Sequence, residues 1–235
     1  MTSRIQALTI DALDPAALAA FWGALVGEDP GLALRFQPTD APKSTPNQAH
    51  FDLTSATDAA QAALVETALS LGARHHDVGQ TGDEGHVVLA DPEGNEFCVI
   101  EAGNRFLAGT AAIGALSCDG SRDVGHFWSQ VLDWPLVWDQ DEETAIQSPD
   151  GGTKISWGGP PFRAKTGKNR WHLDLVADDL DAEVERLLAL GARHADIGQG
   201  ETAWVVLSDP DGNEFCVARA DQPTLTASAS LDDSP

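Results

Sequence analysis

The sequence predicts an α+β protein built from four similar units, and three observations lead to this fold class. The segment LSLGARHHDVGQ at 69–80 returns as LALGARHADIGQ at 188–199. VVLADPEGNEFCV at 87–99 returns as VVLSDPDGNEFCV at 205–217. Each half also contains two places where a strand pattern is followed by a helix pattern, and an internal repeat of this kind indicates a duplicated structural unit.

The repeats divide the chain into two expected domains, residues 1–105 and 110–220, each with two βαβββ units. In the first half, a short apolar run precedes an amphipathic stretch that contains Phe21 and Trp22. The second half has Phe127 and Trp128 at the matching place. We therefore expect a strand and then a helix at the start of each half.

The last unit shows its elements most clearly. WHLDLVA, at 171–177, alternates in the manner of a half-buried strand, and the apolar spacing from Asp181 to Leu190 predicts a helix that stops at Gly191. VVLSD and NEFCVA are then two strands joined by Asp-Pro-Asp-Gly, in which Pro presets the turn and Gly supplies the positive φ that closes it. The same hairpin is expected after the repeat in the first half.

The third unit is longer and is rich in Pro and Gly, with PDGG at 149–152 and GGPP at 158–161. The basic run RAKTGKNR at 163–170 is expected to be an exposed loop. It is either simply solvated or a clamp for a phosphate or carboxylate over a pocket. Residues 221–235 lack apolar periodicity and are predicted to be a disordered tail.

Composition limits the functional classes. The 235 residues are 42% hydrophobic and 22% charged, which is typical of a folded protein, and the net charge of −23 disfavours nucleic acid and anionic membrane as partners. This acidity either only maintains solubility or suits a cationic ligand. The most apolar stretch, Ala16 to Gly27, is too short to span a bilayer. Three cysteines are too few for a disulfide framework, so we expect a cytoplasmic protein.

Polar residues on the predicted strands form the candidate site. Because side chains alternate between faces, His50 shares a face with Asp52, and His172 with Asp174. On the return strands of the hairpins, Glu96 shares a face with Cys98, and Glu214 with Cys216. A His, carboxylates and a Cys on one curved face could hold a metal, bind a ligand or transfer protons. The structural alternative is that the carboxylates satisfy neighbouring groups and the cysteines are small core residues.

Tryptophan is unevenly distributed, with Trp22 alone in the first half, and aromatic walls suit a small-molecule pocket. The second half is therefore favoured for ligand binding. The predicted catalytic residues are His50, Asp52, His172 and Asp174. The predicted substrate-binding residues are Glu96, Cys98, Trp157, Trp204, Glu214 and Cys216.

The paired units, an Asp-Pro helix start followed by Ala-Ala-Phe-Trp, and the closing hairpins together resemble the vicinal oxygen chelate superfamily, which includes glyoxalase I, extradiol dioxygenases and bleomycin-resistance proteins. The resemblance covers about residues 1–220 and implies tandem glyoxalase-like domains with cupped mixed sheets and helices outside. It also implies that His50 and His172 occupy metal-ligand positions.

The chain departs from the metal-binding pattern of that superfamily. Four residues after the hairpin glycines, where the resemblance implies Glu, stand Cys98 and Cys216. The opening strands offer Ala7 and Ile113, which cannot bind a metal. The resemblance therefore implies an incomplete site for a divalent metal and a reaction other than that of glyoxalase I.

Three functional hypotheses follow. The first is an enzyme of lyase, isomerase or dioxygenase-like type that acts on a small organic molecule in the cup. The second is a non-catalytic protein that sequesters an antibiotic or metabolite, as bleomycin-resistance proteins do, and the third is a scaffold in which one half has lost its site. The fused repeat implies a monomeric pseudo-dimer or a homodimer.

Overall fold

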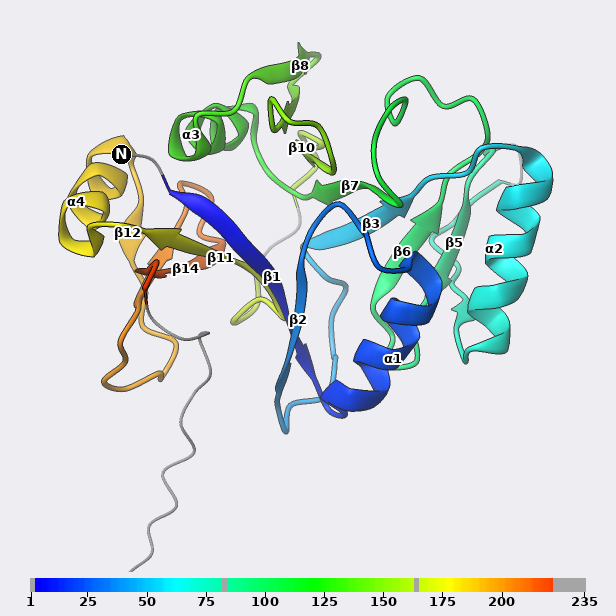
Figure 1. Ribbon diagram of the computed structural model, residues 1–235, viewed down its shortest axis with the longest axis horizontal. Coiled ribbons are helices and arrows are strands. Elements are labelled where there is room, and N and C mark those ends of the chain that lie inside the picture. The colour runs from blue at the N-terminus through cyan, green and yellow to red at the C-terminus, as the bar shows by residue number, and fades with distance from the viewer. Residues whose placement is uncertain (1–2, 82–83, 163–164, 222–235) are drawn as a thin grey trace, which may run out of the picture.

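A computed structural model describes residues 3–81, 84–162 and 165–221 and confirms the predicted α+β architecture (Figure 1). The predicted tail lies outside the described residues from 222 onward. The elements of the first half are β1 (Arg4–Ala12), α1 (Pro15–Val26), β2 (Leu34–Pro38), β3 (Ala49–Leu53), α2 (Asp58–Ser70), β4 (Arg74–His75), β5 (Val87–Ala90) and β6 (Glu96–Val99). Those of the second half are β7 (Ile113–Cys118), α3 (Arg122–Leu132), β8 (Leu136–Gln140), β9 (Glu143–Gln147), β10 (Lys154–Trp157), β11 (Trp171–Ala177), α4 (Leu180–Leu190), β12 (Arg193–His194), β13 (Val205–Ser208) and β14 (Glu214–Arg219).

Each helix begins at a capping side chain. These caps accept a hydrogen bond from the backbone N–H three residues later and so satisfy an otherwise unpaired donor; they are Asp14, Thr57, Ser121 and Asp179. Helix α4 ends at Gly191, whose φ of 116° is left-handed, and this confirms the predicted stop.

The two predicted hairpins are confirmed, and one side chain organises each turn. In β13–β14, the Asp209 carboxylate accepts hydrogen bonds from the backbone N–H groups of Asp211 (3.0 Å) and Asn213 (2.9 Å). Asp91 does the same in β5–β6. The repeated Asp-Pro-x-Gly-Asn sequence therefore encodes a closed turn that brings the return strand back in register.

The first unit is shorter than the βαβββ pattern predicts. After β2 the chain runs without a strand to β3, so this unit contributes β1, α1 and β2. Pro38, Pro42 and Pro46 fall in or beside this connection, and proline cannot donate to a strand ladder. The missing strands explain why one sheet is smaller than the other.

The strands form two mixed sheets, and each sheet contains strands from both halves of the sequence. The six-stranded sheet has the order β12-β13-β14-β11-β1-β2, and the eight-stranded sheet has the order β4-β5-β6-β3-β7-β10-β9-β8. At their centres, β1 pairs antiparallel with β11, and β3 pairs antiparallel with β7. The first unit is thus joined to the fourth and the second to the third.

Helices α1 and α3 connect the two sheets through one continuous core (Figure 1). Trp22 of α1 packs edge-on against Phe51 and Phe97 of the eight-stranded sheet. Trp128 of α3 packs in the same way against Phe215 of the six-stranded sheet. The faces of the sheets opposite these aromatic contacts are left for the polar residues.

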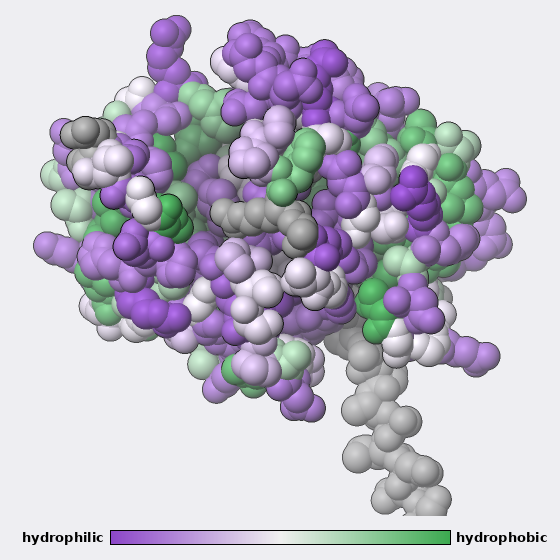
Figure 2. All heavy atoms as spheres, turned by 180° about the vertical axis from the view of Figure 1, so that it is seen from behind, coloured by the Kyte–Doolittle hydropathy of each residue, from purple (hydrophilic) through white to green (hydrophobic). Residues whose placement is uncertain are grey.

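Hydrophilic residues cover most of the face shown in Figure 2, in keeping with 37 Asp and Glu residues in the chain. Hydrophobic residues gather there only in separate small groups. Within the described part of the chain, no helix has the length and apolar character needed to cross a bilayer.

Candidate functional site

Two equivalent polar clusters lie on the two sheets. His50, Asp52 and Cys98 form the first triad, on the eight-stranded sheet, and His172, Asp174 and Cys216 form the second triad, on the six-stranded sheet. In each triad, one ligand atom per residue lies within 4.8 Å of the others. The structure therefore brings together the predicted histidines, aspartates and cysteines in the groups that the sequence repeat implied.

Strand pairing explains both triads. Asp52 on β3 is the register partner of Cys98 on the parallel strand β6, and Asp174 on β11 is the partner of Cys216 on β14. The histidine stands two residues before each aspartate and so points to the same face. Phe51 and Phe97 are register partners on the other face, where they pack in the core.

Hydroxyl groups from the third unit face the first triad. Ser117 on β7 is the partner of His50 and donates a hydrogen bond of 2.5 Å to the carboxylate of Asp52. Ser156 on β10 is the next residue in this row, and its Oγ lies 3.2 Å from that of Ser117. The two serine side chains are uncharged and short, so they leave space above this face of the sheet.

That space is a cavity of about 360 Å³, which we call the cup cavity. The side chain of His50 opens into it and is 41% exposed. Polar and aromatic residues share its lining, namely His50, Phe106, Ser117, Asp119, Trp138, Glu143, Thr144, Ser156 and the predicted Trp157. Aromatic walls with a few convergent polar groups are typical of small-molecule sites.

The charges of the first triad favour a protonated histidine. The Nε2 of His50 lies 3.4 Å from Oδ1 of Asp52. Burial alone would lower the pKa of His50, but hydrogen bonds and charge interactions with Asp52 and Cys98 outweigh it and raise the pKa to about 10. Burial also raises the pKa of the Cys98 thiol.

The second triad faces a charged partner instead. Nη1 of Arg35 on β2 donates to Oδ2 of Asp174 at 2.6 Å, and the Thr9 hydroxyl donates to the same oxygen. The side chains of His172 and Asp174 are only 7% and 2% exposed. The prediction that the strand 171–177 is half-buried is therefore wrong, because Arg35 and Thr9 fill the face expected to be open.

The two triads differ in whether they fit a divalent metal. The first offers a nitrogen, an oxygen and a sulfur donor and leaves the cup side open, which suits a three-ligand catalytic site for Zn²⁺. In the second, the guanidinium of Arg35 already pairs with the carboxylate of Asp174. A cation there would have to displace an arginine from a buried carboxylate, so the second triad does not fit a metal.

The predicted substrate-binding glutamates pair with residues of the loops that precede β3 and β11. Glu96 binds the Lys43 ammonium at 2.5 Å, and Glu214 accepts hydrogen bonds from Lys165 and from the backbone N–H of Asn169. The basic loop is exposed at residues 165–168, as predicted, but Asn169 and Arg170 are half-buried, and Lys168 binds Asp11 of β1 at 2.6 Å. These contacts match the structural alternative for the glutamates.

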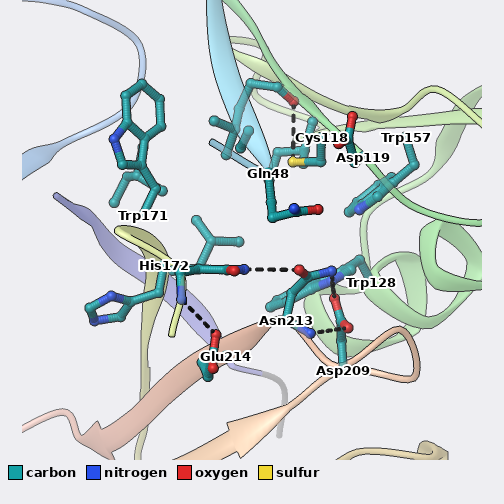
Figure 3. Close-up of a pocket in the computed structure, with 16 residues that line it drawn as sticks. Gln48, Cys118, Asp119, Trp128, Trp157, Trp171, His172, Asp209, Asn213 and Glu214 are labelled. Atoms are coloured by element: carbon teal, nitrogen blue, oxygen red, sulfur yellow. Dashed lines mark hydrogen bonds between the residues drawn. The ribbon is translucent and has the colours of Figure 1, made fainter. Parts of the chain in front are cut away.

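The predicted tryptophans lie at different depths. Trp157 is 2% exposed and belongs to the core, and Trp204 is half-buried just before β13. Trp157, Trp128 and Trp171 line a small cavity of about 60 Å³ between the sheets, and the imidazole of His172 points away from it (Figure 3). His172 and Glu214 also belong to the lining of this inner cavity, so it borders the second triad at His172 and is separate from the first triad.

Sequence reasoning missed the residues that complete the cup cavity. Trp138 and Phe106 line its walls, and Ser117 and Ser156 belong to its floor. The alternation in KISW at 154–157 was a usable signal, because it places Lys154 and Ser156 opposite the buried pair Ile155 and Trp157. Nothing in the sequence pattern links that strand to His50.

The family model described as "Glyoxalase-like domain" matches residues 7–100 and again residues 114–218. The chain belongs to the glyoxalase-like domain family. This confirms the resemblance inferred from the repeated hairpins. No curated protein matches the chain.

Solved structures agree on the fold of this glyoxalase-like protein. Glyoxalase I from Zea mays is 13% identical with a TM-score of 0.61, and the alignment covers 93% of this chain and 92% of that one. A putative dioxygenase from Bacillus subtilis subsp. subtilis str. 168 is 14% identical with a TM-score of 0.58, covering 94% and 86%. TnmS3, an antibiotic binding protein from Streptomyces sp. CB03234, is 22% identical with a TM-score of 0.33, covering 45% and 92%. At these identities the likeness to the first two structures concerns the fold alone, and no conclusion is based on the third.

Proposed function

We propose that this glyoxalase-like protein binds a small oxygenated organic molecule in the cup cavity, and that the first triad performs acid–base chemistry of the lyase or isomerase type on it. One observation carries the proposal: the first triad opens onto a cavity of about 360 Å³ and exposes 41% of the His50 side chain. The His172 side chain, in contrast, is 7% exposed. Small-molecule pockets have volumes of about 300–1,000 Å³.

His50 is the proposed proton donor. Asp52, 3.4 Å away, orients its imidazole and stabilises the protonated form, while Ser117 holds the Asp52 carboxylate from the other side. A protonated imidazole on the cavity wall can donate a proton to a substrate oxygen as negative charge develops there, while the proton on the adjacent carbon passes to solvent water. A divalent cation held by His50, Asp52 and Cys98 would replace this proton, because a histidine that binds a metal is deprotonated, and would supply Lewis-acid polarisation of such an oxygen instead.

The second triad has a structural role in this proposal. Arg35 and Thr9 satisfy the buried carboxylate of Asp174 and link β1 and β2 to β11. His172 and Asp174, both predicted to be catalytic, are thus assigned to the stability of the six-stranded sheet.

Deuterium exchange tests this proposal. The protein is incubated in D₂O with a panel of small α-hydroxy ketones and 2-oxo acids, and carbon-bound deuterium is followed by NMR. We expect the wild type to accelerate exchange for at least one compound, His50→Gln to lose this activity and His172→Gln to keep it. The proposal fails if the wild type accelerates no exchange, or if His50→Gln is as active as the wild type.

A second candidate function is sequestration without chemistry. One observation favours it: the third unit contributes the hydroxyls of Ser117 and Ser156, and no further acid, base or metal ligand, to the row that contains His50. Tight stoichiometric binding of a compound that is recovered unchanged would support this function, and a chemically altered product would exclude it.

A further inference from the structure

We propose that the ligand of the cup cavity is an anion, a small aromatic or conjugated carboxylate, and that Lys154 binds its carboxylate group. This inference rests on the proposed function, because it assumes that the cup cavity is the binding site. It adds the chemical class of the ligand and a binding residue that lies outside the first triad.

Strand register places Lys154 beside the first triad. Lys154 on β10 is the partner of Ala115 on β7, and Ala115 is the partner of Asp52 on β3. Neighbouring strands are about 4.8 Å apart, so the Cα atoms of Asp52 and Lys154 are separated by about 10 Å. Ala115 lies between them and has only a methyl side chain, which leaves room for a ligand over this row.

Lys154 is unusual among the cations of the chain. Most Lys and Arg side chains pair with carboxylates, namely Arg4, Arg35, Lys43, Arg122, Lys165, Lys168, Arg170, Arg186 and Arg219. Within the described residues, Arg74, Arg105 and Arg193 have no ion pair, but all three are exposed. Lys154, in contrast, is half-buried, and within the same described residues it also has no ion pair, although the chain contains 37 Asp and Glu residues.

The ammonium group of Lys154 has unused hydrogen-bonding capacity. Its Nζ donates to the carbonyl oxygen of Phe106 and lies 4.7 Å from the centre of the Phe106 ring. A lysine ammonium has three donors, so two remain. Burial without a counter-charge destabilises the charged form of Lys154, and an anionic ligand would relieve that cost.

Two carboxylates line the cup cavity, those of Asp119 and Glu143, and both are too distant to serve as this counter-charge. Asp119 lies four residues after Ala115, the β7 partner of Lys154. Glu143 lies four residues before Gln147, the β9 partner of Lys154. At about 3.3 Å per residue, these positions are about 13 Å apart, and Glu143 is exposed. Lys154 is next to the cavity lining, because its Nζ contacts Phe106, which lines the cavity. A ligand carboxylate at Lys154 would lie against Phe106, and the rest of the molecule would extend past Ser156 toward Trp138.

Two matched probes test the inference: 2-naphthoate and its uncharged amide, 2-naphthamide. Their shapes are nearly the same, so a difference in affinity reports the charge. Calorimetric titration measures the affinity of each probe for the wild type, for Lys154→Met and for Arg193→Met. Arg193→Met removes the same charge from an exposed site on the other sheet, and circular dichroism verifies that each variant is folded.

We expect the wild type to bind 2-naphthoate about tenfold or more tightly than 2-naphthamide, in line with a hydrogen bond to a charged group. Lys154→Met should lose this preference while its affinity for 2-naphthamide stays the same, and Arg193→Met should behave as the wild type. Equal binding of both probes by the wild type, or an unchanged preference in Lys154→Met, overturns the inference and leaves the proposed function standing. If neither probe binds the wild type, the proposed function fails for aromatic ligands and this inference fails with it.

Discussion

The two triads contain the same residue types in the same register, but they face different partners. Opposite His50 and Asp52 stand Ser117 and Ser156, and the residues in the equivalent positions opposite the second triad are Thr9 and Arg35. Serine leaves the first triad open to a cavity, and arginine closes the second with an internal cation. Residues from the unit that pairs with each triad therefore determine which of the two triads is open to a cavity.

The largest expected effect comes from removing the arginine that closes the second triad. Arg35→Met removes the guanidinium from Asp174, whose side chain is 2% exposed, and leaves this buried carboxylate with the Thr9 hydroxyl and His172 as its neighbours. We expect the free energy of unfolding to fall by about 3–5 kcal/mol, measured by urea denaturation. The matched variant Ser156→Ala should cost about 1 kcal/mol or less. Similar losses for both variants would contradict the assigned difference between the triads.

Metal binding provides a second test of the comparison. We expect the chain to bind one equivalent of Zn²⁺, because among the described residues the first triad alone offers a cluster of three donors without a competing arginine. Cys98→Ser should weaken binding by about 100-fold, since it removes a direct thiolate ligand, and Cys216→Ser should leave it unchanged. Elemental analysis after dialysis gives the stoichiometry. Two bound equivalents, or a loss in Cys216→Ser, would show that the second triad also binds.

A third test introduces an arginine into the eight-stranded sheet at the position equivalent to Arg35 of the six-stranded sheet. Ser156→Arg places a guanidinium where Arg35 stands in the six-stranded sheet, within reach of Asp52. We expect the affinity for 2-naphthoate to fall by about tenfold or more because the side chain fills the cup cavity. Thermal unfolding should show little change, since the new cation has a carboxylate partner. Unaltered probe affinity would mean that the ligand does not occupy the space over Ser156.

The smallest expected effect is a change in one titration. After treatment with a chelator, the imidazole signals of His50 should titrate by NMR with a pKa of about 10 in the wild type. Asp52→Asn should lower that pKa by about one unit or more, because the stabilising carboxylate is lost. The stabilisation that His50 provides is complete below its ordinary pKa near 6.5 and is lost as the pH rises through about 10. A pKa near 6.5 in the wild type would contradict the proposed ion pair.

Local patterns predicted a large part of this structure. Strand alternation grouped His50 with Asp52, and the Asp-Pro-x-Gly-Asn turn predicted the hairpin that brings Cys98 beside them. These features depend on residues that are close in sequence or joined by one turn. The prolines at 42 and 46 could also have predicted that the first unit has fewer strands than the other units, because proline cannot donate to a strand ladder.

The partners of the triads were not predictable in the same way. Arg35 reaches Asp174 across 139 residues, because β2 and β11 belong to a sheet that joins the first and fourth units. Ser156 likewise faces His50 only through β7. Pairing between distant units depends on how whole sheets pack, and no local pattern reports it.

The exchange of strands between the halves has a consequence for the order in which the protein can fold during synthesis. The eight-stranded sheet uses only strands between residues 49 and 157, so it can be completed while the residues after 157 are still being made. Strands β1 and β2 precede that sheet in the sequence, but the antiparallel partner of β1 is β11, which follows it at residues 171–177. In the meantime β1 has an unpaired edge, and pairing with β11 of another nascent chain is the assembly error to which this topology is most exposed.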